Sequence, residues 1–200
     1  EIHKTKDITF SLLQFEQCFS QTNPNICDEM LNWVESGVNQ ISDDVLELHC
    51  GLGTFTILLS KLFRKVLATE NSRPSVKGLQ KNLDLNKSTN VHFARMSGQE
   101  TFAALNQERV FNRLSDIDLS SFKFSTIFLD PPREGLDRKT IQNSSKFEHI
   151  IYISCGFESF KRDLSYLKET HEIKRMAMFD QFPYTEHIES GAILSRKAPD

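Results

Sequence analysis

Leu46-Glu47-Leu48-His49-Cys50-Gly51-Leu52-Gly53-Thr54-Phe55-Thr56 is the stretch that decides the fold. It carries an apolar strand into a turn with two glycines and then into the start of a helix. Turns of this kind let a ligand approach the backbone closely and place it at the positive end of a helix. The stretch therefore predicts an α/β protein with a ligand site where this strand ends.

Short runs of β-branched and aliphatic residues alternate with helix-like runs from Asp44 onward, which predicts repeated βαβ units. The expected strands are residues 44–49, 65–70, 90–95, 125–130, 149–154, 172–179 and 190–196, and the expected helices are 26–38, 54–63, 74–86, 98–106, 138–146 and 158–169. Only a short connection containing Pro183 joins the last two strands, so that pair should be antiparallel at the edge of the sheet. A seven-stranded, mainly parallel, Rossmann-like sheet with an antiparallel last strand favours a methyltransferase over a dehydrogenase.

The totals describe one globular domain of 200 residues, with 38% hydrophobic residues and a net charge of −3. Without an apolar run long enough to cross a membrane, and without a signal peptide, we expect a cytoplasmic protein that does not contact membranes. Cys18, Cys27, Cys50 and Cys155 are irregularly spaced, which predicts free thiols and no metal. We expect a monomer. The sequence pI near 6.1 argues mildly against a nucleic-acid partner.

A nucleoside cofactor is expected beside the glycine turn. The next strand ends in Glu70, seventeen residues beyond Gly53, where an acid can bind the two ribose hydroxyls. Thr56 stands where the dinucleotide-binding fingerprint has its third glycine. The turn therefore lacks the full glycine pattern that binds the pyrophosphate of a dinucleotide. A sulfonium donor fits better than NAD, and an NAD-dependent oxidoreductase remains the alternative.

Two later strands end in candidate site residues. The strand ending at Leu129 runs into Asp130-Pro131-Pro132-Arg133, a rigid loop expected beside the first strand at the edge where open α/β sheets bind ligands. Cys155 ends the fifth strand and precedes Gly156 and a helix, where backbone amides and a helix dipole should lower its pKa. A nucleophile and a small buried cysteine are both compatible with that position.

Seven segments, in order and spacing, resemble the tRNA (uracil-5-)-methyltransferase family. They are residues 21–25, 46–55, 68–70, 111–114, 130–133, 153–155 and 179–185. The resemblance covers about Phe19 to Ser195. The segments 111–114 and 179–185 resemble the tRNA branch of the family rather than the ribosomal-RNA branch.

The resemblance implies S-adenosylmethionine as cofactor, Cys155 as the nucleophile and Glu189 as the base. The residues it places at the donor are Gln21, His49, Gly51, Gly53, Thr54, Glu70 and Asp130. His187 is a generic alternative to Glu189 as proton carrier. Phe157, Phe182 and Tyr184 could stack on a base turned out of its RNA.

Four positions depart from the family pattern. The family usually has tyrosine at His49 and asparagine at Thr54, so we expect altered donor affinity. It has cysteine at Ser190, a change with little expected consequence. It has Asn-Pro at Gly156-Phe157, and the glycine should loosen the turn that holds the nucleophile.

The function implied by the resemblance is methylation of carbon 5 of a T-loop uridine in tRNA, through a covalent cysteine adduct at carbon 6. Residues 21–200 are expected to form the catalytic domain, and residues 1–20 to be the remnant of, or linker from, an amino-terminal RNA-binding region. We therefore expect the chain alone to bind its tRNA substrate weakly. A ribosomal-RNA uracil-5-methyltransferase, or a non-catalytic RNA-binding or RNA-folding module that keeps the donor pocket, remains the alternative.

Overall fold

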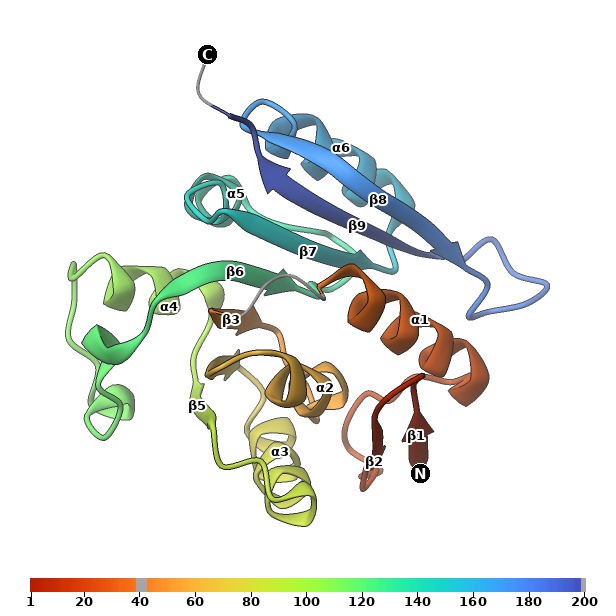
Figure 1. Ribbon diagram of the computed structural model, residues 1–200, viewed down its shortest axis with the longest axis horizontal. Helices are drawn as coiled ribbons and strands as arrows, with labels where there is room; N and C mark the ends of the chain where they lie inside the picture. The colour runs from red at the N-terminus through yellow and green to blue at the C-terminus, as the bar shows by residue number, and fades with distance from the viewer. Residues whose placement is uncertain (39–42, 199–200) are drawn as a thin grey trace.

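A seven-stranded sheet forms the centre of the molecule (Figure 1). The computed structural model describes residues 1–38 and 43–198. In chain order the strands are β3 (Asp44–Leu48), β4 (Val66–Glu70), β5 (Val91–Arg95), β6 (Phe124–Leu129), β7 (His149–Ser154), β8 (His171–Phe179) and β9 (Glu189–Arg196). Their spatial order is β5-β4-β3-β6-β7-β9-β8, and β9 runs antiparallel to both of its neighbours. The predicted fold class and the antiparallel last strand are confirmed, and every predicted strand end lies within about one residue of the observed one.

Helices cover both faces of the sheet (Figure 1). One face packs on α1 (Pro24–Gly37), α2 (Thr54–Leu62) and α3 (Arg73–Asn86), and the other on α4 (Gly98–Leu105), α5 (Arg138–Ser144) and α6 (Phe157–Leu167). Helix α1 begins two residues before its predicted start, because Asn23 caps it and Pro24 suits the first helical position. Two single turns of 3-10 helix, Asn112–Leu114 and Leu119–Ser121, connect α4 to β6.

Alternation along each strand divides the interior into two cores. On β7, Ile151 and Ile153 belong to the core beneath α1 to α3, whereas Ile150 and Tyr152 belong to the core beneath α4 to α6. This follows from the two-residue period of a strand that is covered on both faces. Cys155, two positions beyond Ile153, is therefore expected on the α1–α3 side of the sheet.

The amino-terminal segment packs against this framework. Strands β1 (Ile2–Lys4) and β2 (Thr9–Ser11) form an antiparallel hairpin, and Phe10 joins the core beneath α1 to α3. The fully buried Asn82 of α3 accepts a hydrogen bond from the Leu13 amide at 2.7 Å. Its side-chain amide donates to the carbonyls of Leu13 and Leu52, at 3.1 Å and 2.9 Å. One side chain thus ties the amino-terminal segment and the glycine turn to the same helix.

Replacement of Asn82 by alanine should lower the free energy of unfolding by about 2–4 kcal/mol, because three hydrogen bonds are lost and buried backbone groups stay unpaired. Chemical denaturation measures this change. The exposed Gln80 of the same helix provides the control, since Gln80→Ala should change stability by less than about 0.5 kcal/mol. Equal effects of the two substitutions would contradict this role of Asn82.

Candidate functional site

A cavity of about 780 Å³ lies where β3, β4, β6 and β7 end and β9 begins. This volume falls in the range of small-molecule sites. The predicted site residues that line it are Gln21, His49, Gly51, Thr54, Glu70, Asp130, Cys155 and Glu189. Gly53, the remaining predicted residue, is the N-cap of α2 at the edge of the same turn. The structure therefore brings the predicted residues together at one place.

Strand register puts the carboxylates of the cavity on one face of the sheet. Glu47 pairs with Ala68 on one side and with Phe128 on the other, and paired residues project from the same face. Glu70 follows Ala68 by two residues, and Asp130 follows Phe128 by two residues. All three acids consequently lie on the α1–α3 side. Glu47 is a lining residue that the sequence did not predict, and its signal is a carboxylate inside an apolar strand.

The same alternation brings the cysteine and the last carboxylate to this face. Cys155 follows Ile151 and Ile153 of β7 at two-residue intervals. Ile153 pairs with Gly191 of β9, and Glu189 stands two residues before Gly191. Because β9 is antiparallel to β7, Glu189 at its start lies next to Cys155, directly beyond the end of β7.

The glycine turn holds its shape through left-handed backbone at three positions, with φ of 61° at His49, 55° at Gly51 and 92° at Gly53. Histidine adopts this region more readily than most non-glycine residues. The amide of Gly51 donates to Glu70 Oε2 at 3.1 Å, and the amide of Ser72 donates to Glu70 Oε1 at 2.6 Å. The carboxylate at the tip of β4 is thereby oriented before any ligand binds.

Gln21 reaches the cavity from the segment before α1. Its side-chain carbonyl accepts a 2.7 Å hydrogen bond from the side-chain amide of Gln181, which is buried in the segment between β8 and β9. The sequence motif that contains Gln181 predicted no role for it. The bond links the two segments that frame opposite sides of the cavity.

Cys155 is half-buried, and burial raises the pKa of its thiol. The carboxylates of Glu189 and Asp130 raise this pKa further, while Arg133 and a backbone hydrogen bond lower it. The expectation that amides and a helix dipole leave a net lowered pKa is wrong here, because burial and two carboxylates outweigh them. These surroundings therefore favour the protonated thiol.

Glu189 is 2% exposed, and burial raises the pKa of its carboxyl to about 7, with Arg133 acting against the shift. The Arg133 guanidinium donates to Nδ1 of His187. His187 and Phe182 both line the cavity, with their rings edge to face at 6.1 Å. Phe157 and Tyr184 are exposed and absent from the lining, so only Phe182 of the three predicted stacking aromatics reaches the cavity.

Gly156 allows a close approach of two loops. A Cβ atom built there would lie 2.4 Å from the carbonyl oxygen of Arg133 and 2.6 Å from Ser159 Oγ. The Ser159 hydroxyl in turn lies 2.7 Å from the Arg133 carbonyl and 2.9 Å from the Gly156 carbonyl. The space left by the missing side chain is filled by the neighbouring loop, whereas Gly156, as the N-cap of α6, makes no side-chain cap hydrogen bond, so the loosening of this turn stays a prediction.

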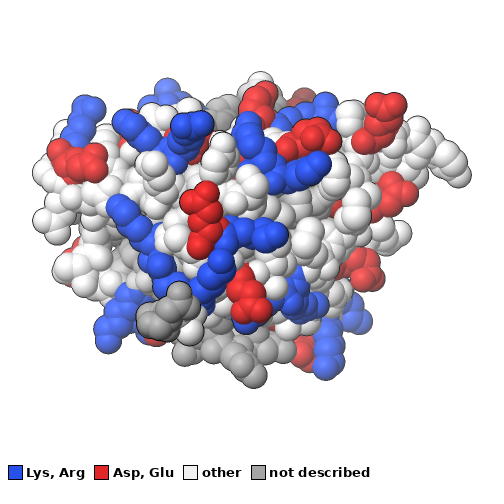
Figure 2. All heavy atoms as spheres, turned by 90° about the horizontal axis from the view of Figure 1, so that it is seen from above, with Lys and Arg blue, Asp and Glu red and all other residues white. Residues whose placement is uncertain are grey.

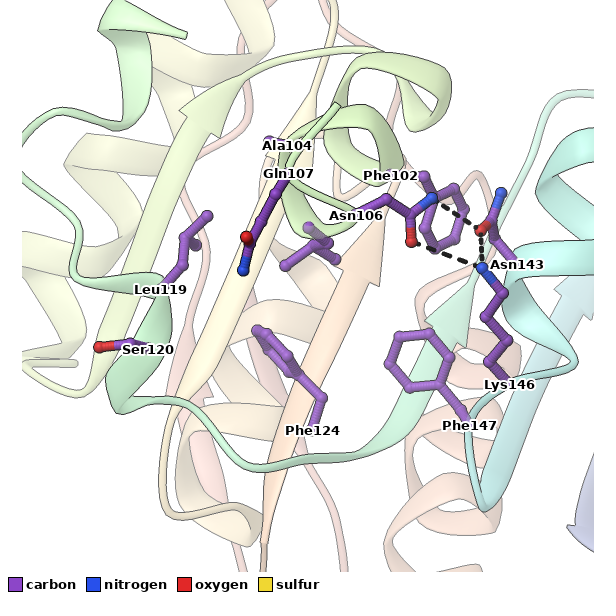
Figure 3. Close-up of a pocket in the computed structure, with 11 residues that line it drawn as sticks. Phe102, Ala104, Asn106, Gln107, Leu119, Ser120, Phe124, Asn143, Lys146 and Phe147 are labelled. Atoms are coloured by element: carbon purple, nitrogen blue, oxygen red, sulfur yellow. Dashed lines mark hydrogen bonds between the residues drawn. The ribbon is translucent and has the colours of Figure 1, made fainter. Parts of the chain in front are cut away.

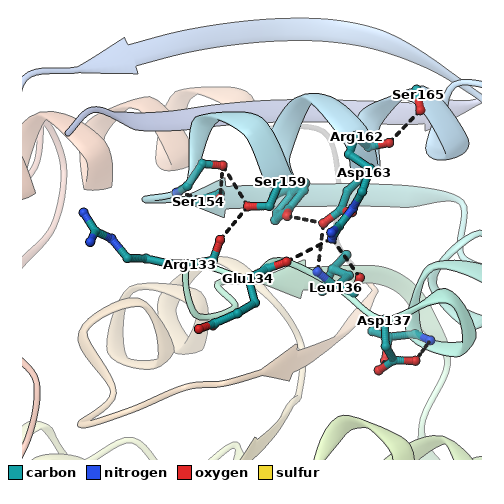
Figure 4. Close-up of polar contacts among 12 residues, drawn as sticks. Arg133, Glu134, Leu136, Asp137, Ser154, Ser159, Arg162, Asp163 and Ser165 are labelled. Atoms are coloured by element: carbon teal, nitrogen blue, oxygen red, sulfur yellow. Dashed lines mark hydrogen bonds and ion pairs between the residues drawn. The ribbon is translucent and has the colours of Figure 1, made fainter. Parts of the chain in front are cut away.

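The fully buried Asp163 of α6 anchors the rest of that loop (Figure 4). Its Oδ2 accepts hydrogen bonds of 2.8 Å from the Leu136 amide and from the Tyr152 hydroxyl. Arg162 donates to Asp163 Oδ1 at 2.9 Å and also reaches the Leu136 carbonyl. The loop after β6 and the turn after β7 are consequently fastened to one helix.

A second hollow of about 420 Å³ lies at the opposite end of β6 (Figure 3). Its polar groups bond to one another, since Lys146 Nζ donates to the side-chain carbonyls of Asn143 and Asn106, at 2.8 Å and 3.4 Å. None of the predicted site residues lines it. We therefore take the first cavity as the candidate active site.

Charged side chains of both signs share one face of the molecule. Figure 2 shows lysines and arginines intermixed with aspartates and glutamates on the upper face of Figure 1. Within residues 1–38 and 43–198, no group of three or more histidine, cysteine, aspartate or glutamate side chains is placed to hold a metal ion. Over the same residues, no helix has the length and apolar character needed to cross a membrane.

Replacing Gly156 with alanine should displace the Arg133 loop and lower the thermal midpoint by several degrees, because the new Cβ would overlap a backbone oxygen. Gly98→Ala is the matched control, since its Cβ would meet its nearest neighbour at 3.4 Å, an ordinary contact. A Gly156→Ala protein as stable as the Gly98→Ala protein would contradict the close approach of the two loops.

Replacing Glu47 with glutamine should stabilise the protein at high pH. Burial, with a smaller contribution from Asp130 and Glu70, raises the pKa of Glu47 from an ordinary 4.5 to about 8, while the Thr56 hydroxyl acts against this rise. The folded state therefore loses stability as pH rises from 4.5 toward 8, by up to about 1.4 kcal/mol per pH unit across that window. Thermal midpoints of Glu47→Gln and the parent should agree near pH 4 and diverge by several degrees near pH 8. Glu35→Gln, at a buried carboxylate outside the cavity, is the control, and an equal divergence there would contradict the assignment.

The family model for tRNA (uracil-5-)-methyltransferase matches residues 1–197. A tRNA/tmRNA (uracil-C(5))-methyltransferase of Teredinibacter turnerae is 48% identical over 191 residues, which cover 96% of this chain and 52% of the relative. Its counterpart in Aliarcobacter butzleri is 51% identical over 185 residues, covering 92% and 49%. The chain thus spans about half the length of these curated relatives.

Among solved structures, the tRNA (uracil-54, C5)-methyltransferase of Pyrococcus abyssi, in complex with S-adenosyl-L-homocysteine, superposes with a TM-score of 0.74. The match is 24% identical and covers 97% of this chain and 44% of that one, so it supports the fold. Together with the match over residues 1–197, these relatives show that the chain belongs to the tRNA (uracil-5-)-methyltransferase family.

Proposed function

We propose that this chain methylates carbon 5 of a uridine in the T loop of tRNA, with S-adenosylmethionine as donor and Cys155 as covalent nucleophile. The observation that carries the proposal is the juxtaposition of Cys155 and Glu189 at the end of β7 and the start of β9, in the same cavity as the glycine turn. A thiol and a carboxyl beside a nucleoside site are the two groups that this reaction needs.

The donor end of the cavity fits S-adenosylmethionine. The Glu70 carboxylate, held by two backbone amides, is oriented for ribose hydroxyls. The turn through Gly51 and Gly53 keeps the backbone open to close approach. When bound, S-adenosylmethionine supplies an electrophilic methyl group on a positively charged sulfur, and the acids of the cavity suit that charge.

Cys155 begins the reaction. Carbon 5 of uracil is too weak a nucleophile until the Cys155 thiolate adds to carbon 6 and moves electron density onto carbon 5. Carbon 5 then takes the methyl group, and the electron pair of the broken bond stays on the donor sulfur. Arg133, the cation beside both Cys155 and Glu189, favours the anionic thiolate.

Glu189 ends the reaction. Its carboxylate removes the proton from carbon 5, the electron pair restores the double bond between carbons 5 and 6, and the Cys155 sulfur leaves. A carboxyl with a pKa of about 7 is suited to accept a proton near neutral pH. His187 is engaged by Arg133, which favours Glu189 as the base.

The RNA must present a uridine turned out of its loop, because the reacting cysteine sits inside a cavity. Of the three aromatic residues predicted to stack on that base, Phe182 is the one that lines the cavity, and in this proposal it makes the stacking contact. In this proposal residues 21–200 form the catalytic domain. Since the chain spans about half of its curated relatives, we propose that it binds tRNA weakly by itself.

Incubation with 5-fluorouracil-substituted tRNA and S-adenosylmethionine tests the mechanism, because fluorine at carbon 5 blocks the final proton removal. The protein should form a covalent complex with the RNA, visible on a denaturing gel at high protein concentration. Cys155→Ala should abolish the complex. Cys18→Ala, at another partly exposed free cysteine that also lines the cavity, should still form it, because the proposal assigns the covalent bond to Cys155 alone. A complex that persists in Cys155→Ala, or none with the intact chain at saturating RNA, would contradict the proposal.

A further inference from the structure

Glu47 is a buried carboxylate that the proposed reaction does not use. It lies in the interior of β3, between the apolar Ala68 and Phe128 of the two neighbouring strands. Its side chain is 1% exposed and lines the cavity, and its Oε2 atom has no hydrogen-bond partner, although the Thr56 hydroxyl of α2 acts to lower the pKa of this carboxyl. Burial of an unpaired carboxylate costs several kcal/mol unless a ligand or a proton compensates. The group is therefore oriented toward something that enters the cavity.

Asp130 lies one strand away on the same face. It follows Phe128, the register partner of Glu47, by two residues, so the two side chains project into the same cavity. Burial raises the pKa of Asp130 well above its usual range, and Glu189 and Glu70 raise it further. Burial likewise raises the pKa of Glu47 to about 8. Burial therefore favours the protonated form of both acids when the cavity contains no cation.

The other groups facing the pair do not neutralise it. Among the described lining residues, the carboxylates are Glu47, Glu70, Asp130 and Glu189, against one arginine, Arg133. Arg133 donates to His187, and burial lowers the pKa of His49, which disfavours its charged form. The thiols that line the cavity are Cys18, Cys50 and Cys155, the buried thiol of Cys27 lies in the core beneath it, and Thr56 of α2 contributes a neutral hydroxyl. The cavity consequently carries an excess of acids.

We propose that Glu47 and Asp130 form a proton-holding acid pair that releases a proton when a sulfonium cation enters the cavity, which makes Glu47 a specificity-determining residue for the charged donor. The inference rests on the proposed function for the identity of that cation. Methyl transfer removes the charge from the donor sulfur, so the pair takes the proton back and holds the neutral thioether less tightly.

The direction of the pH dependence follows from the raised pKa values. Below about pH 6 the pair holds its protons firmly, and the donor must displace them, so donor affinity is low. As pH rises toward 8, removing the protons from the acid pair costs less free energy, so donor affinity increases. Above the pKa of about 8, Glu47 is ionised in the empty cavity, so its share of the proton release disappears.

Isothermal titration calorimetry measures the proton release directly, since the observed heat then depends on the ionisation heat of the buffer. Titrations of the 200-residue chain in phosphate and in Tris, near pH 7, should show that S-adenosylmethionine binding releases on the order of half a proton. S-adenosylhomocysteine, which lacks the sulfonium charge, should release distinctly less. Glu47→Gln should lose most of the release.

The same titrations measure how strongly Glu47 favours S-adenosylmethionine over S-adenosylhomocysteine. Glu47→Gln should weaken S-adenosylmethionine binding relative to S-adenosylhomocysteine binding by roughly tenfold, because the lost charge interacts with the sulfonium alone. Glu35→Gln, the matched buried carboxylate outside the cavity, should leave the ratio of the two affinities unchanged. If Glu47→Gln does not fold, the intact chain still tests the inference, because its S-adenosylmethionine affinity should rise with pH more steeply than its S-adenosylhomocysteine affinity.

Binding of both ligands without proton release, or equal release in Glu47→Gln and the intact chain, would overturn the inference and leave the proposed function standing. Failure of the intact chain to bind either ligand at millimolar concentration would overturn the proposed function, and the inference with it.

Discussion

The alternation of side chains along paired strands is the constraint on which the rest of the site depends. Glu47, Glu70, Asp130, Cys155 and Glu189 come from five strands or strand ends, yet all lie on one face because each stands in register, or at an even interval from it, with the others. A slip of one residue in any strand would turn its group toward the opposite core. The apolar pattern that buries both faces of the sheet therefore also assembles the chemistry.

Helix α6 maintains the position of the reacting loops. Asp163 holds the loop after β6 through Leu136, and Ser159 joins that loop to the turn after Cys155. The absence of a side chain at Gly156 lets the Arg133 carbonyl come close to that turn. The proposed nucleophile Cys155 and the Arg133 guanidinium thus belong to one packed unit, which has little tolerance for any added atom at Gly156.

The sequence predicted the strands, the antiparallel ending and the residues that gather in the cavity well, because apolar periodicity and strand-end motifs are local signals. It did not predict a place in the cavity for Glu47, whose importance depends on the absence of a partner in β4 and β6. It also predicted the wrong direction for the Cys155 pKa and did not predict how closely the Arg133 loop approaches Gly156. Both depend on neighbours more than 20 residues away in the chain, Glu189 and Arg133, which no local pattern reveals.

The central claim is that these side chains form a single site built for a charged methyl donor beside a reactive cysteine. A crystal structure of the chain with S-adenosyl-L-homocysteine tests it most directly. The account predicts the ribose hydroxyls at Glu70 and the sulfur in the same cavity as Asp130 and Cys155, with Glu189 beside the cysteine. A ligand bound in the hollow near Asn143, or Cys155 turned away from the bound ligand, would contradict it.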